Sequence, residues 1–527
     1  MNEPFGTLAG SFLFTVGVVL GYSPGTMRRT IAGAFLGATV MFAAAKAATG
    51  ATPERWVETR STHFVVLTDA SEKDARRLAS QFERMHMVFH TLLPAKGDDT
   101  DPPIVVVAVR DRKGMQALEP EEYLGKDRID LGGFFLRAPE KNYILVRLDA
   151  QEEHAYANVY HEYTHYMLRK ADGWLPLWLN EGLAQFYENT DIDEKTVWLG
   201  QANAEELRFL GRIDLLPMET LLKVDTKSPY YHDEQKGSVF YAESWALTHF
   251  LIVSDRIQGT HRMRDYAERL ARGEDAVSAA RAAFGDLDKL QQGLSDYVMQ
   301  RKFMYFMMPA KLDAKDAAAE VRPVTTAEAD AVRADMMIYT KRTAEAKALA
   351  EAVLREEPGS AQAHETMGTL SYSEGDFASA KKWYREAVEL DTHNYLTHYD
   401  YAMMALRSGA RAEDEAIETS LQASIALNAG FAPAYDTLAM FYAARHRKLD
   451  EALTLNLKAV ELEPDRLSYR LNCSEVLLEQ RQAVEALGVL QEALRLAKTP
   501  EEVAAVKSRM VRAERYQETL SKAVGGG

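Results

Sequence analysis

The sequence predicts two parts, an α+β domain followed by an all-α solenoid of helical repeats. Two observations support this division. Between residues 51 and 150, short segments rich in β-branched and aromatic residues alternate with one amphipathic helix, and a mostly helical pattern follows to about residue 308. From about residue 326, related helix ends recur at steps of 33 to 37 residues, which is typical of a repeat solenoid.

The composition is that of an ordinary globular protein. Of the 527 residues, 47% are hydrophobic and 27% are charged, which excludes wholesale disorder. The single cysteine, Cys473, excludes an internal disulfide and any zinc site built from cysteines. A formal net charge of −16 leaves no surplus of basic side chains to neutralise phosphates, so nucleic acid is not an expected partner.

Residues 1–47 have the pattern of an export signal. Two apolar runs, Leu8–Tyr22 and Ile31–Ala45, are each too short for a membrane span of ~20 residues. Two arginines precede the second run, and a small-x-small pattern that ends at Ala47 follows it, which is the order of a secretory signal. The true start can be Met27, and the alternative to a signal is a hairpin of two short membrane helices. We expect an exported bacterial protein, periplasmic, envelope-bound or secreted, with no membrane span once the signal is removed.

Residues 48–150 are predicted to form a strand-rich N-terminal lobe of the first domain. His63–Thr68 and the unbroken apolar run Pro103–Val109 predict strands. Between them, Ser71–Leu93 predicts a helix, because its apolar residues recur at three- and four-residue steps. Gly132–Leu136 and Tyr143–Leu148 predict a hairpin around a polar turn, and either strand is a candidate to bind an extended substrate.

A helical lobe, residues 151–308, contains an H-E-x-x-H motif that begins at His161. On a helix, positions i and i+4 share one face, so His161 and His165 can bind one metal ion while Glu162 can reach a water beside it. Glu181 follows 16 residues after His165 and can supply a third ligand from a second helix. Two histidines and one glutamate leave one coordination position open, which is the ligand set of a catalytic zinc ion, Zn2+.

The same residues allow other interpretations. The motif can arise by chance on a surface helix, and a metal site can persist after catalysis is lost. Glu188 competes with Glu181 for the third ligand position. Glu181 has the small neighbours Gly182 and Ala184, which suit two helices pressed together at a metal, and Glu188 does not.

The H-E-x-x-H motif with N-E-G-L-A after it resembles the gluzincin metallopeptidases, and it is most similar to their peptidase MA-like group over roughly residues 55–305. The resemblance implies a zincin-like α+β fold, zinc on the three ligands named above, and Glu162 as the general base. In aminopeptidase gluzincins a tyrosine at a comparable distance donates to the oxyanion, and Tyr241 lies 80 residues after His161. The alternatives are that Tyr241 only packs and that His232 is the donor.

The C-terminal part carries the repeats. Residues 309–325 are polar and alanine-rich with two prolines, so they are the predicted linker. The most regular unit, Ser360–Asp391, resembles the tetratricopeptide (TPR) repeat, and the resemblance covers residues 326–498. A capping helix is predicted for residues 499–520, and the repeats imply a concave groove for a protein partner.

These features predict an exported zinc metallopeptidase that hydrolyses peptide or protein substrates and recruits substrates or partners through its TPR array. The alternative is an envelope scaffold that acts through the array and whose peptidase-like lobe is vestigial.

Overall fold

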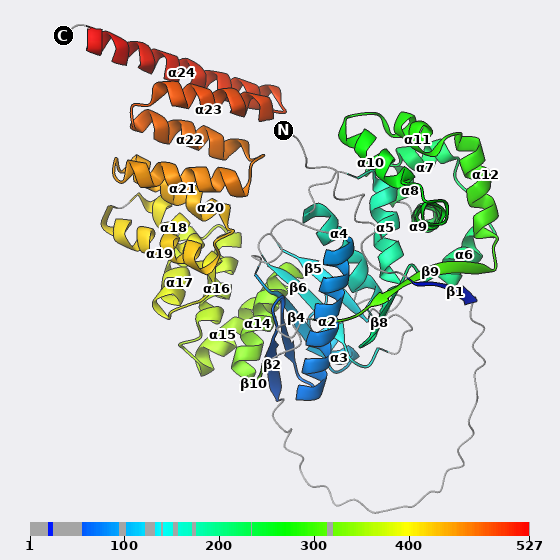
Figure 1. Cartoon of the computed structure of the whole chain (residues 1–527). Coiled ribbons are helices and arrows are strands. Elements are labelled where there is room, and N and C mark those ends of the chain that lie inside the picture. The colour runs from blue at the N-terminus through cyan, green and yellow to red at the C-terminus, as the bar shows by residue number, and fades with distance from the viewer. Residues whose placement is uncertain are drawn as a thin grey trace, which may run out of the picture. The chain divides into compact units, whose positions relative to one another are not determined.

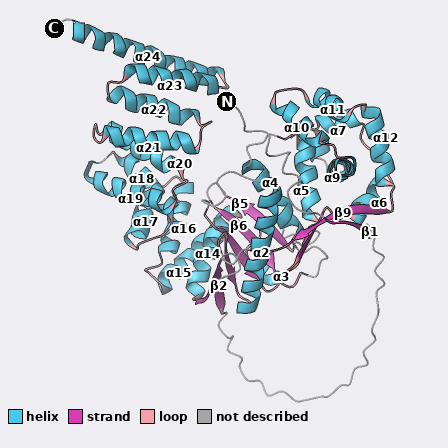
Figure 2. Cartoon of the chain, in the orientation of Figure 1, coloured by secondary structure: helices cyan, strands magenta, loops and turns pink. Residues whose placement is uncertain are grey.

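The computed structural model describes residues 19–24, 55–93, 102–121, 132–138, 141–150, 156–170, 175–232, 234–312, 320–409 and 411–525. These residues form two compact units, which divide at Ala329 and Asp330. Figure 1 names the helices and strands, and Figure 2 shows that helices predominate and that the strands of the described chain belong to the first unit. The structure is therefore an α/β unit followed by a helical one.

The first unit is built on a six-stranded mixed sheet in the order β10-β2-β3-β4-β6-β5. β3 is parallel to β4 and β4 to β6, whereas the other neighbouring pairs are antiparallel. β5 and β6 form the hairpin that the sequence predicts. The strands are β2 (Trp56–Arg60), β3 (Phe64–Thr68), β4 (Ile104–Val109), β5 (Gly133–Arg137), β6 (Asn142–Arg147) and β10 (Glu320–Val324).

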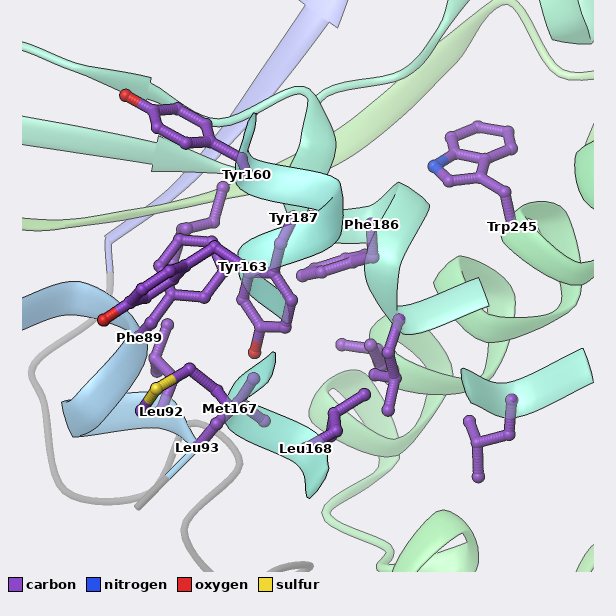
Figure 3. Packing of buried hydrophobic residues seen from close by; sticks show 14 of the residues in the cluster. Phe89, Leu92, Leu93, Tyr160, Tyr163, Met167, Leu168, Phe186, Tyr187 and Trp245 are labelled. Atoms are coloured by element: carbon purple, nitrogen blue, oxygen red, sulfur yellow. The ribbon is translucent and has the colours of Figure 1, made fainter. Parts of the chain in front are cut away.

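Helix α2 (Glu72–Leu92) joins this sheet to the helices that follow. Its N-terminus is capped by Ser71, whose side chain accepts a hydrogen bond from the Asp74 amide. The ring centroid of Phe89 lies 5.4 Å from that of Tyr163 in α4 (Ala157–Lys170) and 5.2 Å from that of Tyr187 in α5 (Leu177–Glu188). Figure 3 shows these rings side by side among the buried side chains. The aromatic core therefore fixes α4 and α5 against α2.

A second, smaller sheet has the order β1-β9-β8-β7, with every pair antiparallel. Its strands are β1 (Val19–Pro24), β7 (Asp191–Ile192), β8 (Thr196–Leu199) and β9 (Lys302–Pro309). β1 includes the last four residues of the first apolar run, 19–22, and these are in a strand paired with β9. The rest of that run lies outside the described residues. The second apolar run lies outside the described residues.

The predicted linker, residues 309–325, is wrong over its last part. Glu320–Val324 forms β10 and pairs with β2 along the whole strand. Its residues are largely exposed because β10 is an edge strand, and an edge strand also tolerates Pro323. The polar composition and the prolines thus predicted a linker where the chain adds a strand to the sheet. The Arg322 guanidinium of β10 donates a hydrogen bond to the Glu58 carboxylate of β2 at 3.0 Å.

Helices complete the first unit. They are α3 (Arg112–Gln116), α6 (Ala204–Leu210), α7 (Met218–Lys223), α8 (Pro229–His232), α9 (Glu234–Gln258), α10 (Arg262–Ala271), α11 (Ala276–Phe284) and α12 (Leu287–Val298). α9 packs against α5, α6, α8, α10 and α12, so it is the central helix of this part. Among the described residues, no helix is both long enough and apolar enough to span a membrane.

Glu243 of α9 is a fully buried carboxyl group. One of its oxygens accepts a hydrogen bond from the Leu216 amide at 2.8 Å, and the other has no partner in the described chain. Burial raises the pKa of Glu243 to about 8, although the Leu216 amide opposes the rise. Because this pKa exceeds that of the unfolded chain, Glu243 favours the folded state below pH ~4.5, and that contribution is lost as the pH rises through 8.

We expect Glu243→Gln to gain stability over the wild type as the pH rises from 5 to 8, by up to roughly 1.4 kcal/mol per pH unit. The amide cannot ionise, and its oxygen can still accept from Leu216. The free energy of unfolding, followed by tryptophan fluorescence across this range, measures the difference. Glu194→Gln, at an exposed turn, is the matched control. A pH-independent difference between Glu243→Gln and the wild type would contradict the assignment.

The second unit is a stack of helix pairs, as the repeats in the sequence predict. Five pairs follow one another and α24 covers the last (Figure 1). The helices are α14 (Thr326–Tyr339), α15 (Thr343–Glu356), α16 (Ala361–Ser373), α17 (Phe377–Glu389), α18 (Tyr395–Ser408), α19 (Asp414–Leu427), α20 (Ala432–Ala444), α21 (Leu449–Leu462), α22 (Leu467–Glu479), α23 (Ala483–Leu496) and α24 (Pro500–Gly525). A short 3-10 helix, η3 (Arg411–Glu413), occupies the irregular connection before α19.

Small residues and caps explain why these helices pair and end where they do. A Cβ atom at Gly368 would lie 2.6 Å from the Tyr384 ring, so glycine permits the close contact of α16 with α17. Gly375, in the turn between them, has a φ of +79°, a left-handed conformation that favours glycine. At the start of α24, the capping helix that the sequence predicts, Thr499 and Glu502 exchange hydrogen bonds in a capping box.

Candidate metal centre

The structure brings His161, His165 and Glu181 together. Both histidines project from the same face of α4, and Glu181 comes from α5. The His161 and His165 Nε2 atoms are 3.1 Å apart. Glu181 Oε2 lies 3.5 Å from the Nε2 atom of His161 and 3.4 Å from that of His165. Each of the three side chains thus offers one ligand atom, and the three atoms are close enough together to share a metal ion.

The spacing of these three atoms fits zinc. Zinc binds imidazole nitrogen and carboxylate oxygen at ~2.0–2.2 Å, usually in tetrahedral geometry, so two of its ligand atoms are separated by about 3.3 Å. The observed separations of 3.1, 3.4 and 3.5 Å surround that value. The predicted ligands therefore have a suitable chemistry and a suitable geometry, and the bound ion stays a prediction.

Gly182 allows Glu181 to reach the histidines. A Cβ atom at Gly182 would lie 2.1 Å from Thr248 Oγ1 and 2.4 Å from the Ser244 carbonyl oxygen, both in α9. Any larger residue would push α5 and α9 apart. Ala184 is fully buried in the same helix. The small neighbours of Glu181 thus have the packing role that the sequence suggests, although their close partner is α9.

Glu188 occupies a different place from Glu181. Its Oε2 atom lies 3.0 Å from His161 Nδ1, on the opposite side of the ring from the cluster. Because a carboxylate can only accept, Nδ1 carries the proton and Nε2 is left with the lone pair that a metal needs. Glu188 as the third ligand, the alternative from sequence, does not agree with this geometry. It is placed to orient His161, one of the predicted ligands.

The carboxylates also change the protonation of the centre in the absence of a metal. Burial alone lowers the pKa of His161, but hydrogen bonds with Glu181 and Glu188 raise it to about 10. Burial likewise raises the pKa of Glu181, and the two histidines outweigh this and lower it to about 2. The centre therefore attracts positive charge, which a proton or a metal ion can supply.

We expect Glu188→Gln to weaken zinc binding by roughly 10- to 100-fold without abolishing it, because the ligands remain and only the orientation of His161 suffers. Competition with a chelator of known affinity measures the change. Glu194→Gln, which removes the same charge at an exposed turn that does not line the cleft, should bind zinc as the wild type does. Complete loss of zinc from Glu188→Gln would instead make Glu188 a ligand.

The cluster lies in an open cleft of about 1650 Å³. Glu162 lines this cleft and is exposed, whereas its neighbours Tyr160 and Tyr163 are buried in the core. One face of α4 therefore lines the cleft, and the opposite face packs in the core. A carboxylate beside the ligands, open to solvent, can accept a proton from a water in the cleft.

Tyr241 of α9 lines the same cleft together with Tyr231 of α8. The two ring centroids are 6.1 Å apart. Burial, the charge of Glu181 and a hydrogen bond between the two phenols raise the pKa of Tyr241 above its usual range. The phenol therefore keeps its proton at neutral pH and can donate it. His232, the alternative donor, ends α8, and its side chain lies outside the described residues.

Sequence reasoning missed two functional candidates, namely the orienting role of Glu188 and the place of Glu206 in the wall of the cleft. Glu188 carried a signal, because it follows Glu181 at i+7, two helical turns along α5. Glu206 carried none, since helix α6 approaches the cleft only through tertiary packing. Tyr231 belongs to a polar aromatic stretch, residues 230–233, that the sequence offers as a candidate wall of the cleft, and it does line the cleft.

The comparisons with known proteins bear on different parts of the chain. Residues 149–270 match the model of a family described as "Protein of unknown function (DUF1570)". That range contains His161, Glu162, His165, Glu181 and Tyr241. No curated protein gives a significant match to the chain.

Solved structures of low sequence identity also resemble the chain. YrrB, described as a TPR protein with an unusual peptide-binding site, is 18% identical with a TM-score of 0.31, and the match covers 34% of this chain and 90% of YrrB. TTC0263, a TPR protein of Thermus thermophilus, is 19% identical with a TM-score of 0.26 and coverages of 36% and 98%. PilF of Pseudomonas aeruginosa is 18% identical with a TM-score of 0.28 and coverages of 38% and 93%. Each of these matches covers little more than a third of this chain.

Proposed function

We propose that the first unit is a zinc-dependent metallopeptidase with the zincin-like fold expected from its motifs. The observation that carries the proposal is the three-atom cluster, with ligand separations of 3.1 to 3.5 Å, beside Glu162 in an open cleft. A zinc ion held there would polarise the scissile carbonyl group and make a neighbouring water more acidic. The other steps belong to side chains of this chain.

Glu162 takes the proton from the attacking water and delivers it to the leaving amine. Tyr241 donates a hydrogen bond to the carbonyl oxygen as negative charge develops on it. Glu188 keeps the lone pair of His161 Nε2 directed at the centre. These roles follow from the position of each group, and together they describe peptide-bond hydrolysis.

The sheet edge favours one of the two strands considered for substrate binding. β6 is paired on both sides, with β4 and with β5, so it has no free edge. β5 is the edge strand and pairs only with β6 within the described chain. It also packs against α4, the helix that carries both histidines. An extended peptide can therefore add to β5 and pass the metal centre.

Metal content and hydrolysis test the proposal together. The purified full chain should contain about one zinc ion and should cleave members of a mixed peptide library. Stoichiometric zinc without cleavage would reject the peptidase and leave a metal site of another function. The absence of zinc after growth in its presence would reject the site itself.

A second candidate function is a protein-interaction scaffold, which the TPR-like helix pairs favour. A stack of such pairs presents a surface for a protein or peptide partner, independently of any chemistry in the first unit. The two functions are separable, because a vestigial peptidase predicts that Glu162→Gln and the wild type behave alike in every assay.

We also propose that the protein is exported to the bacterial envelope, on the signal pattern in residues 1–47. N-terminal sequencing of envelope material should find a mature chain that starts near residue 48. A mature protein that retains residues 19–24 would instead keep β1 in its sheet.

A further inference from the structure

The wall of the cleft that lies next to His161 is acidic and incompletely satisfied. Glu206 of α6 lines the cleft and is partly buried. Its carboxylate makes no hydrogen bond or ion pair with the described residues, although the charges of Glu188 and His161 both act on it. Glu206 therefore lies at the end of the centre where Glu188 contacts His161.

A second unsatisfied group lies on the same side. Gln185 also lines the cleft, is only 8% exposed, and has a side-chain oxygen with no partner in the described chain. It follows Glu181 by one turn of α5 and precedes Glu188 by three residues, so it shares their face of the helix. An unpartnered buried acceptor is costly, and an N–H donor from a ligand would relieve that cost.

The opposite end of the cleft has the opposite charge. Arg169 lines it and follows His161 by eight residues of α4, which places it about 12 Å further along the helix axis. Arg169 thus adds a positive charge to the lining beyond His165, away from the carboxylates next to His161. A substrate that crosses the centre meets the two charges in a fixed order.

We propose that Glu206, with Gln185 beside the centre, forms a subsite that selects a substrate group bearing a positively charged nitrogen. The inference rests on the proposed peptidase function. The nitrogen belongs either to a basic side chain or to a free N-terminus. An ammonium or guanidinium group donates several N–H bonds, so it can pair with the Glu206 carboxylate and still donate to a further acceptor in the wall of the cleft.

The electrostatics of Glu206 support this assignment. Burial and the nearby charge of Glu188 raise the pKa of Glu206 to about 8, and His161 opposes the rise. A cation bound beside it would stabilise the ionised carboxylate. Glu206 is not needed to cap its own helix, because Asn203 accepts hydrogen bonds from the amides of Glu205 and Glu206.

The test measures binding to the zinc-loaded full chain carrying Glu162→Gln, which separates recognition from turnover. Four hexapeptides serve as probes, each polyalanine with lysine or norleucine at the third position and with a free or an acetylated N-terminus. Titration calorimetry should give a roughly 10- to 100-fold tighter complex with whichever nitrogen occupies the subsite, the size of a charge-assisted hydrogen bond. If the peptides with norleucine bind more weakly than those with lysine, the subsite binds a side-chain cation. If the acetylated peptides bind more weakly than those with a free N-terminus, it binds the N-terminus.

Two further variants locate the preference. Glu206→Gln, added to Glu162→Gln, should abolish it, while Glu205→Gln, one residue away on the same cleft wall, should retain it. Equal affinity for all four peptides, no binding of any, or an equal loss for all four in Glu206→Gln would overturn the inference. If Glu206→Gln does not fold, the comparison of the four peptides on the parent still decides whether a cation is preferred. Hydrolysis of the mixed library by the wild type judges the peptidase function separately.

Discussion

Glu162→Gln is expected to lower the rate of peptide hydrolysis by roughly 100- to 10,000-fold while the protein keeps its zinc and its fold. The side chain is exposed in the cleft beside His161 but is not part of the three-atom cluster, so its loss should remove the proton acceptor and spare the ligands. General acid–base groups typically contribute roughly 100- to 10,000-fold to a rate. We expect a fall in kcat of that size, measured on a peptide from the library, with unchanged metal content by mass spectrometry.

The ligand variants provide the contrast. His161→Ala and Glu181→Ala should each lose zinc, because two remaining ligands bind the ion far more weakly than three. Zinc that persists in Glu181→Ala would transfer the third ligand to another group, and Glu188 could take that place only by leaving His161 Nδ1. Turnover that survives in Glu162→Gln would show that another residue accepts the proton.

Tyr241→Phe is expected to lower kcat by roughly 100- to 1000-fold, the usual cost of losing one oxyanion donor. The Michaelis constant should change little, because the carbonyl oxygen acquires its charge only in the transition state. Zinc content should stay unchanged, since Tyr241 lines the cleft without belonging to the cluster. Steady-state kinetics on one library peptide, with zinc measured on the same samples, distinguishes this result from misfolding.

The neighbouring phenol is the natural comparator. Tyr231 is hydrogen-bonded to Tyr241, so Tyr231→Phe should have a smaller effect if it only orients the donor. A larger loss in Tyr231→Phe than in Tyr241→Phe would exchange their roles. If both variants retain turnover and His232→Ala loses it, the donor is His232.

Local patterns in the sequence are enough to predict much of this molecule. The i, i+4 spacing of His161 and His165 places both rings on one face of any helix, whatever surrounds it. Ser71 and Thr499 cap α2 and α24 because capping involves only neighbouring residues. The TPR-like pairs are equally local, since each helix contacts mainly those next to it in the chain.

The positions of groups that meet across long sequence separations were decided only by the tertiary structure. Glu181 and Glu188 lie on one helix, and only the packing of α5 against α4 and α9 assigns one to the cluster and the other to the far side of His161. β10 pairs with β2 across more than 250 residues, a contact that its polar sequence does not reveal. Tyr231 and Glu206 line the cleft from two short helices, α8 and α6. The residues of each helix determine that it is helical, but packing against the rest of the unit determines where it lies. Along one helix, the backbone sets which side chains share a face and which hydrogen bonds form. Contacts between helices or strands that are far apart in the sequence depend instead on how the whole core packs.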